Sequence, residues 1–329
     1  MNLPANTLPN FIHAGVPKSA SATINAMLRT HPDVFLPRQK EPSFFNTDDR
    51  FAEGLDWYSA THFANAQGEK ILGDMSIGYA TGFGFDTARR IAETLGTDLK
   101  ILLTFREPIA RAYSQYGMSH NKGQLEQLGF AEAIDRALAA GPGITEADRL
   151  RVRTGTYYSS KSDMDAFRWC MYVEPGHYAD IYETWAGLFG ADNILVLLTD
   201  DIAADFQRQA DRLFAFLGLD PITVEPDMKR NVATALRYPA MRRLLNRLYA
   251  FGPLRQFLNA PRLDRFRKSL RRRFLTRNYV ENSQVQAPDP EAVMRLRDHY
   301  EPQIVRLEKL LGRDLTMWRA KYARETGEP

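Results

Sequence analysis

Cysteine is nearly absent from this chain of 329 residues, which contains only Cys170. A disulfide within the chain and a cysteine-rich metal site are therefore excluded, and a single thiol fits a reducing compartment. No segment reaches the roughly 20 consecutive apolar residues of a membrane-spanning helix. The N-terminal stretch MNLPANTLPN also lacks the basic and apolar regions of a secretory signal peptide. These absences predict a soluble, cytoplasmic protein.

A large excess of one charge is missing as well, because the formal net charge is only +3. Basic residues concentrate in residues 241–278, where twelve Arg and Lys accompany a single acid, Asp264. Because the basicity is local, the overall charge gives no argument for nucleic-acid binding, and we expect none. Arg interleaved with Leu and Phe predicts a basic helical segment here. It fits either an amphipathic helix in peripheral contact with an anionic membrane or a helical cap with a solvated basic face.

Hydrophobic residues make up 44% of the chain, enough for a large core. Short apolar runs rich in β-branched or aromatic residues predict strands, and amphipathic helical patterns lie between them. The predicted strands are 11–16, 34–36, 71–73, 99–105 and 194–198. Strands that alternate with helices predict an α/β fold of P-loop-like type, with a parallel sheet flanked by helices. We expect one domain over residues 1–329.

Residues 117–176 depart from this alternation. They contain one helical segment near 130–140, followed by a polar stretch without a clear period. Such a stretch predicts a lid or an insertion that binds the acceptor substrate. After the basic segment, a last amphipathic helix is predicted over residues 290–311.

The most informative segment is FIHAGVPKSASATINAML, residues 11–28, in which an apolar run breaks at Gly15 into a polar loop carrying Lys18. We expect Ser21 to cap the helix that follows. Backbone N–H groups at the helix start and the Lys18 ammonium would then converge on one phosphate or sulfate. Small side chains and hydroxyls suit such an anion site at Ser19, Ala20, Ser21, Ala22 and Thr23.

The loop departs from the Walker A pattern, because Lys18 lies three residues after Gly15 with no Gly directly before it. An ordinary NTPase is thereby disfavoured. Taken alone, the segment is also compatible with a strand-to-helix turn that carries a surface lysine.

A second segment, LKILLTFREPIARAYSQYGMSH, predicts an apolar strand that ends at Arg106 and a helix that starts at Pro108. Arg111 and Ser114 lie off the apolar stripe of that helix. We therefore expect Arg106 and Ser114 to face the crevice at the carboxyl end of the sheet. The fork-shaped Arg106 guanidinium suits a second phosphate there.

At these two segments the chain resembles the sulfotransferases that use 3′-phosphoadenosine 5′-phosphosulfate (PAPS). The resemblance implies that PKSASAT binds the 5′-phosphosulfate, with Lys18 at the bridging and sulfuryl oxygens. It also implies that Arg106 and Ser114 bind the ribose 3′-phosphate, and that adenosine 3′,5′-bisphosphate is the product. Ala20 and Ser21 stand where the family usually has Gly and Thr, which narrows backbone freedom at Ala20.

The segment KEPSFF, which begins at Lys40, resembles the one that supplies the catalytic glutamate in heparan-sulfate-type and many bacterial sulfotransferases. Sulfuryl transfer requires an in-line arrangement, a base and positive charge. We expect Glu41 to accept the proton of the acceptor hydroxyl and Lys18 to stabilise the leaving phosphate. Lys40 would assist at the sulfuryl group or tune the pKa of Glu41. The reaction needs no metal.

Several assignments stay open at this level. His62 or His120 is the rival base, because cytosolic steroid- and phenol-type sulfotransferases use a histidine. Asp74 and Ser76 are candidates for acceptor contact or for capping a strand. By the same resemblance, a loop carrying Arg230 and Arg237 would return to the cofactor.

The acceptor is expected to be a carbohydrate, a lipid or another small molecule, and the oligomeric state is open. The alternatives to a sulfotransferase are a P-loop-type small-molecule kinase and a non-catalytic nucleotide- or membrane-binding module.

Overall fold

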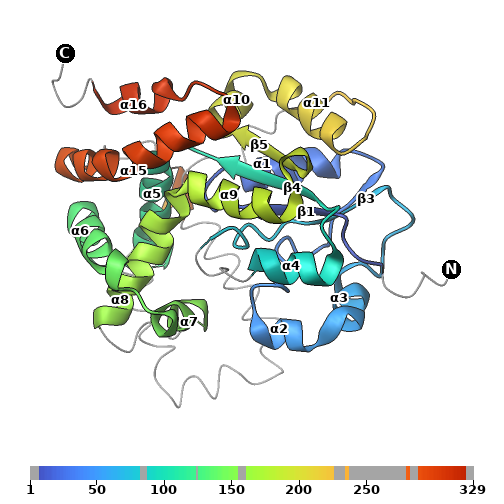
Figure 1. The fold of residues 1–329 in the computed structure, drawn as a ribbon, viewed down its shortest axis with the longest axis horizontal. Helices are drawn as coiled ribbons and strands as arrows, with labels where there is room; N and C mark the ends of the chain where they lie inside the picture. The colour runs from blue at the N-terminus through green and yellow to red at the C-terminus, as the bar shows by residue number, and fades with distance from the viewer. Residues whose placement is uncertain are drawn as a thin grey trace. The chain divides into compact units, whose positions relative to one another are not determined.

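The computed structural model describes residues 7–81, 87–123, 125–154, 161–225, 234–236, 279–281 and 288–323. A five-stranded parallel sheet lies at the centre of the larger part of the chain, in the order β2-β3-β1-β4-β5 (Figure 1). The strands are β1 (Phe11–Gly15), β2 (Val34–Phe35), β3 (Ile71–Asp74), β4 (Lys100–Phe105) and β5 (Ile194–Leu198). The predicted strands and the predicted parallel α/β fold are therefore confirmed.

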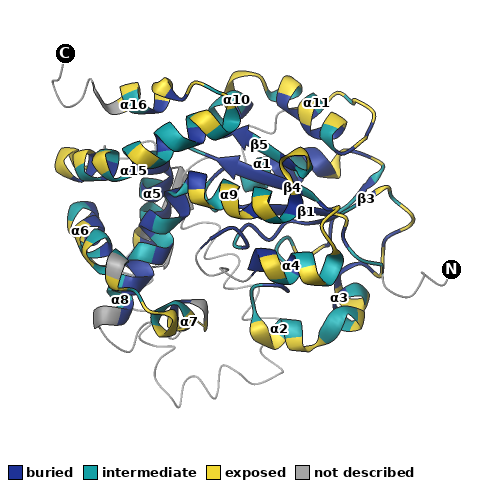
Figure 2. Cartoon of the chain, in the orientation of Figure 1, coloured by how far each residue is buried: buried dark blue, intermediate teal, exposed yellow. Residues whose placement is uncertain are grey.

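Helices cover both faces of this sheet, because the central strands are apolar on both sides. Leu102 of β4 packs in one core cluster with Met27 and Phe214, which come from α1 (Ser21–Arg29) and α11 (Phe206–Phe216). The ring of Phe105 points to the other face and stacks on Tyr178 of α9 (Tyr178–Phe189), with 4.3 Å between centroids. Figure 2 shows the strands largely in the dark blue of buried residues and the outer helices with exposed yellow edges.

The remaining helices of the described residues are mostly short. They are α2 (Asp48–Ala52), α3 (Gly54–His62), α4 (Thr87–Leu95), α5 (Pro108–Gly117), α6 (Phe130–Ala140), α7 (Glu146–Thr154), α8 (Lys161–Arg168), α10 (Thr199–Ala204), α15 (Pro290–Leu311) and α16 (Thr316–Ala323). The longest, α15, coincides with the last predicted amphipathic helix. The Asp289 side chain caps its start by accepting from the N–H groups of Glu291 and Ala292.

The chain divides into two compact units. The first comprises residues 1–116, 128–230 and 288–329 and contains the parallel sheet. The second comprises residues 117–127 and 231–287. In it, the structure describes a π-helical turn (Met118–Gly123) and an antiparallel pair, β6 (Thr234–Leu236) and β7 (Tyr279–Glu281). The predicted basic segment, residues 241–278, lies outside the described residues.

Residues 117–176, predicted as one insertion, fall in both units. The part in the first unit is mostly helical rather than irregular: it forms α6, α7, α8 and a π-helical turn at Trp169–Val173. Tyr172 and Val173 in that turn are fully buried. The sequence pattern missed α7 because, among the residues of that helix whose burial the structure describes, only Val152 is buried, too few for a recognisable apolar stripe.

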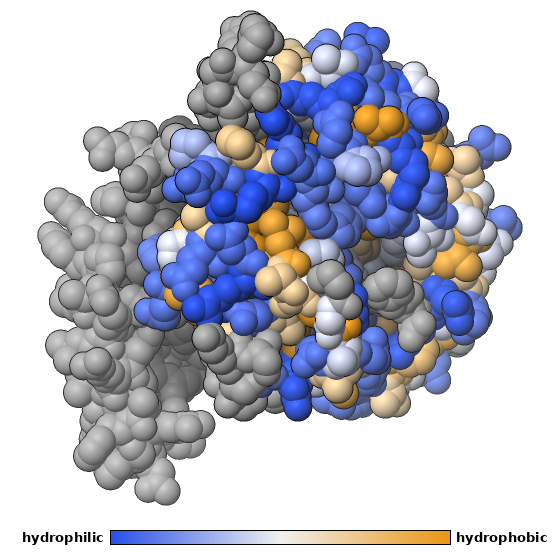
Figure 3. Space-filling model, turned by 60° about the vertical axis from the view of Figure 1, so that its left-hand side comes forward, coloured by the Kyte–Doolittle hydropathy of each residue, from blue (hydrophilic) through white to orange (hydrophobic). Residues whose placement is uncertain are grey.

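Within the described ranges, no helix has the length and apolar character needed to cross a membrane. The face seen in Figure 3 is mainly hydrophilic, and hydrophobic residues form only small patches among the described residues. Large exposed hydrophobic side chains of the first unit are scattered along the chain at Leu150, Met294 and Met317.

Candidate active site

The loops that follow β1, β2, β3 and β4 leave the sheet at the same edge, because these strands are parallel. The loops after β1, β2 and β4 carry Lys18, Glu41 and Arg106, respectively. Asp74 is the last residue of β3 and lies at the same edge. In the strand order, β1 is followed along the chain by β2 at one end of the sheet, whereas β4 is followed by β5 at the opposite end. Ligands of open α/β sheets bind where the strand order reverses in this way. Lys18 and Arg106 therefore follow the two strands that flank the expected crevice (Figure 1).

The loop after β1, residues 15–23, is called the anion loop here. It begins at Gly15, which has a φ of 140° and whose added Cβ would lie 2.4 Å from the Ile77 carbonyl oxygen. Only glycine fits there. Lys18 and Ala20 adopt left-handed backbone conformations with φ of 73° and 62°. Such a conformation costs a non-glycine residue roughly 1–2 kcal/mol.

The start of α1 carries no side-chain cap. Ala20 is the N-cap and Ser21 the first helical residue, so the prediction of Ser21 as the cap was wrong by one position. The left-handed turn at Ala20 is the reason, since it brings the chain into the helix one residue early. The first turn of α1 has no acidic residue. A helix start without a cap or an acid is suited to an anionic ligand.

Hydrogen-bond donors gather around this helix start. Ser19 is fully buried, and its hydroxyl has no partner among the described residues. Ser21, Ala22 and Thr23 are half-buried. Lys40 Nζ reaches in from the loop after β2 and donates to Ser21 Oγ at 3.1 Å. A buried hydroxyl without a partner, two lysines and no nearby acid in the loop fit a phosphate or sulfate group.

Lys40 also links the anion loop to Glu41. Its Nζ lies 3.7 Å from Glu41 Oε1, and the Glu41 side chain is 42% exposed, so an incoming substrate can reach the carboxylate. Partial burial raises the pKa of Glu41, Lys40 opposes this, and the Asp74 carboxylate adds to the rise. An accessible carboxylate with a raised pKa is suited to accept a proton.

Glu41 belongs to a segment, residues 36–45, that is held by side chains from several elements; we call it the base segment. Arg29 donates to the carbonyl oxygens of Leu36 and Pro37, at 3.1 and 2.6 Å. Arg50 donates to the Pro42 carbonyl, and Arg90 donates to that of Phe45 at 2.9 Å.

The N–H groups of the base segment are held from the other side by hydroxyls. Ser43 N donates to Ser76 Oγ at 2.8 Å, and Phe44 N donates to the Tyr79 hydroxyl at 3.0 Å. Both hydroxyls in turn donate to the carboxylate of Asp74. Asp74 and Ser76 are fully buried, which argues against the predicted acceptor contact and favours a structural role.

Sequence reasoning missed Tyr58 and Tyr79, which both donate to Asp74. Tyr79 lies in the segment GDMSIGYA that begins one residue before Asp74, so its proximity was a weak signal. Tyr58 lies in α3, and nothing in the local sequence connects it with Asp74.

Of the two residues predicted to bind a second phosphate, Arg106 lies in the turn between β4 and α5, and Ser114 lies within α5. Arg106 and Ser114 are half-buried, and the Arg106 carbonyl accepts from the Tyr178 hydroxyl at 2.7 Å. Glu107 caps α5 by accepting from the N–H groups of Ile109 and Ala110.

Arg111, which the sequence pattern places off the apolar stripe of α5, is nevertheless not exposed to solvent. It is fully buried and donates to the Met171 and Tyr172 carbonyls. The helical-wheel argument took a charged side chain as solvent-facing, whereas α5 directs this one at carbonyls of the π-helical turn.

The two rival histidines, His62 and His120, belong to different units. His62 is 7% exposed and lies against the rings of Trp57 and Tyr58. Burial lowers its pKa. His120 belongs to the second unit. Arg230 and Arg237 lie outside the described residues. Among the residues that are described, no cluster of three or more His, Cys, Asp or Glu is placed to hold a metal ion.

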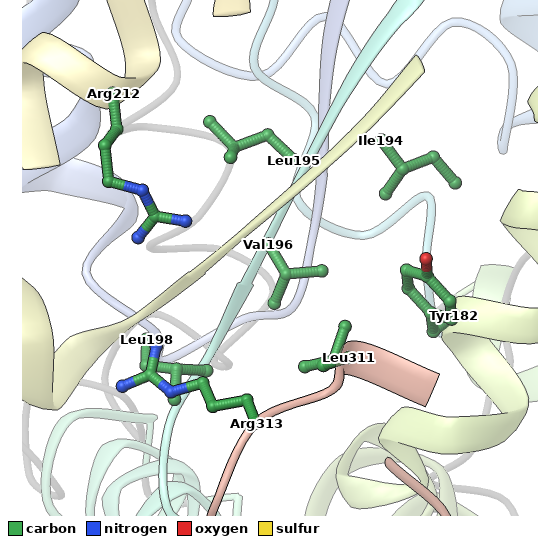
Figure 4. A pocket seen from close by; sticks show the side chains of 8 residues that line it. All are labelled: Tyr182, Ile194, Leu195, Val196, Leu198, Arg212, Leu311 and Arg313. Carbon is green, nitrogen blue, oxygen red and sulfur yellow. The ribbon is translucent and has the colours of Figure 1, made fainter. Parts of the chain in front are cut away.

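A groove of about 190 Å³ lies beside β5, between α9, α11 and the end of α15 (Figure 4). None of the predicted site residues lines it. Of its two arginines, Arg313 already pairs with Asp201 and Arg212 donates to Gln209. The groove is therefore separate from the loops that carry Lys18 and Glu41.

A parallel sheet whose central strand leads through a donor-rich loop into an uncapped helix defines the class of P-loop-like α/β proteins. Within that class, residues 8–244 match the model of the sulfotransferase domain, and the chain belongs to that family.

The chain is similar to several sulfotransferases. It is 34% identical to the membrane-associated sulfotransferase kil1 of Dictyostelium discoideum over 115 residues, which are 34% of this chain and 23% of that protein. It is 24% identical to human heparan sulfate glucosamine 3-O-sulfotransferase 6 over 66% of this chain and 54% of that protein. It is 22% identical to human heparan sulfate glucosamine 3-O-sulfotransferase 3B1 over 93% of this chain and 64% of that protein. The chain thus matches less than two thirds of the length of each of these relatives.

A solved structure supports the fold. The sulfotransferase from Alicyclobacillus acidocaldarius superimposes with a TM-score of 0.62 at 22% identity, over 95% of this chain and 99% of that one.

Proposed function

We propose that this protein transfers a sulfuryl group from PAPS to the hydroxyl of an acceptor, with Glu41 as the base. One observation carries the proposal: Lys40 contacts both Ser21 at the start of α1 and the Glu41 carboxylate, at 3.1 and 3.7 Å. The anion loop and the candidate base therefore meet at one ammonium group. Membership of the sulfotransferase family, which typically uses PAPS, supports the choice of cofactor.

The anion loop would hold the 5′ end of PAPS, and the strand-to-helix turn after β4 would hold its 3′-phosphate. In this proposal the cofactor contacts are Lys18, Ser19, Ala20, Ser21, Ala22, Thr23, Arg106 and Ser114, with Arg230 and Arg237 added from outside the described residues. When bound, PAPS supplies a sulfuryl group whose bond to the bridging phosphate oxygen breaks as the acceptor oxygen bonds to sulfur.

The residues of the chain move one proton and balance the charge. Glu41 accepts the proton that the acceptor hydroxyl loses. Lys18 stabilises the negative charge that develops on the leaving phosphate, and Lys40 lies between the two sites. Lys40 also opposes the rise in the pKa of Glu41 that burial and the Asp74 carboxylate cause, and so favours the ionised carboxylate.

A carbohydrate, a glycolipid or another small molecule with a hydroxyl group is the proposed acceptor. The similarity to heparan sulfate glucosamine 3-O-sulfotransferases favours a carbohydrate. The small-molecule kinase is disfavoured by the family match over residues 8–244. Only a measurement of turnover distinguishes the sulfotransferase from the other alternative, a non-catalytic nucleotide- or membrane-binding module.

Two measurements test the proposal. Calorimetry should show binding of adenosine 3′,5′-bisphosphate and none of ATP; the reverse preference would indicate a kinase. An acceptor screen with sulfur-labelled PAPS should yield a labelled product that disappears in Glu41→Gln and persists in the matched control Glu53→Gln, an exposed carboxylate. Binding of the bisphosphate without turnover on any acceptor would favour the non-catalytic module.

A further inference from the structure

Asp74 is a buried carboxylate with an unusual set of partners. Its oxygens accept from Ser76 Oγ at 2.5 Å, from the Tyr58 hydroxyl at 2.7 Å and from the Tyr79 hydroxyl at 2.8 Å. Its side chain is 0% exposed, and the three partners are buried as well. A buried carboxylate is tolerated only with such compensation, so the four groups form one satisfied network.

The direction of these bonds determines what the hydroxyls can do next. A hydroxyl has one proton, and each of these three hydroxyls donates its proton to a carboxylate oxygen of Asp74. Because Ser76 and Tyr79 give their protons to Asp74, their oxygens remain as acceptors. They accept from the N–H groups of Ser43 and Phe44, and Tyr79 also accepts from Phe45 at 3.3 Å.

The backbone held in this way is the part of the base segment that follows Glu41. Ser43 has a left-handed conformation with φ of 52°, which an unsupported serine rarely adopts. Pro42, between Glu41 and Ser43, has no N–H to add an anchor. The place of Glu41 therefore depends on the side chains that hold its neighbours.

We propose that Asp74 is a positioning residue that acts through Ser76 and Tyr79 to fix the backbone of residues 43–45 and thereby the Glu41 carboxylate. The inference rests on the proposed function, in which Glu41 is the base. Asp74 itself is fully buried, and it accepts hydrogen bonds from Tyr58, Ser76 and Tyr79. Its contribution is to orient two hydroxyls that would otherwise be free to donate elsewhere.

Two tyrosines provide a matched comparison. Tyr58 and Tyr79 each donate to the same oxygen of Asp74, and both are buried. Only Tyr79 continues to the backbone of the base segment; Tyr58 contacts it through ring stacking on Phe44, which a phenylalanine would keep. Tyr58→Phe and Tyr79→Phe thus remove equivalent bonds to Asp74, but only the second removes an anchor.

Amide hydrogen exchange at single-residue resolution tests the proposal without any acceptor. In Tyr79→Phe, the amides of Phe44 and Phe45 should exchange about tenfold faster relative to those of β4, and in Ser76→Ala the amide of Ser43 should do so. Asp74→Asn should affect all three amides. Tyr58→Phe should leave them unchanged relative to β4. Equal effects in the two tyrosine variants, or no change at residues 43–45 in any variant, would overturn the proposal.

Turnover separates this proposal from the proposed function. With heparan sulfate as the probe acceptor, Tyr79→Phe should lower kcat by about tenfold and leave the Kd for adenosine 3′,5′-bisphosphate within about twofold, while Tyr58→Phe changes neither. If Glu41→Gln keeps its activity, the proposed function fails, and hydrogen exchange still decides the positioning role. If Glu41→Gln is inactive but the amides of residues 43–45 exchange at the same rate in all variants, only the positioning role fails. If Asp74→Asn does not fold, the tyrosine pair and Ser76→Ala suffice.

Discussion

The anion loop and the base segment lie at the same edge of the sheet but are held in opposite ways. In the anion loop, the start of α1 has no cap and the buried Ser19 hydroxyl has no partner within the described residues. In the base segment, carbonyls are held by arginines and N–H groups by hydroxyls. Unused hydrogen-bonding capacity indicates a place for a ligand, whereas a backbone held at several points by side chains indicates a group that must keep its position. The comparison supports the proposal that the first region binds the cofactor and the second transfers the proton.

The largest expected effect comes from the base segment. Glu41→Gln removes the proton acceptor and keeps the size of the side chain. We expect kcat to fall by roughly 10²–10⁴-fold, the usual contribution of a general base, with unchanged affinity for adenosine 3′,5′-bisphosphate. Steady-state kinetics and calorimetry on the same preparation check this. A loss of affinity equal to the loss of kcat would contradict the separation of the two regions.

The next effect belongs to the anion loop. Lys18→Ala should weaken binding of adenosine 3′,5′-bisphosphate by roughly tenfold to a hundredfold, the range expected for a hydrogen bond to a charged group. The control is Lys70→Ala, because Lys70 is exposed and pairs with Asp33 at the surface. Calorimetry should show wild-type affinity for the control. Equal affinities in both variants would remove Lys18 from the site.

The pH dependence tests how the two regions are linked through Lys40. Partial burial and Asp74 raise the pKa of Glu41, and Lys40 lowers it. The base must be ionised, so turnover should be lost as the pH falls through this raised pKa. In Lys40→Met the opposing charge is gone, and the acid limb of kcat/KM should move to higher pH. The control is Lys100→Met. Lys100 is the first residue of β4 and donates to the Asn193 side chain, so its loss should leave the acid limb of kcat/KM in place. A shift of the Lys40→Met limb to lower pH would refute the assignment.

The smallest effect concerns the backbone of the anion loop. Ala20 has a φ of 62°, so Ala20→Gly should relieve about 1 kcal/mol of strain and raise Tm. Ala22 lies in α1, where glycine costs roughly 0.5–1 kcal/mol, so Ala22→Gly should lower Tm. Thermal unfolding measures both. A lower Tm in Ala20→Gly would mean that the left-handed turn is not strained.

Local patterns predicted the strands and the order of the motifs, because apolar periodicity and a strand-to-helix break are features of contiguous residues. The same information could not place Tyr58 beside Asp74, since their contact depends on how α3 packs against the end of β3. It also misjudged Arg111, whose charge is satisfied by carbonyls 60 and 61 residues away in the chain. Local sequence patterns therefore predicted the loop between β1 and α1, but they did not predict the hydrogen-bond network that holds the base segment.

The most direct test of the account is a crystal structure of the protein with adenosine 3′,5′-bisphosphate. We predict that the 5′-phosphate contacts Lys18 and the start of α1, and that the 3′-phosphate contacts Arg106 and Ser114. A nucleotide bound elsewhere, such as in the groove beside β5, or bound in the reverse orientation, would contradict the account.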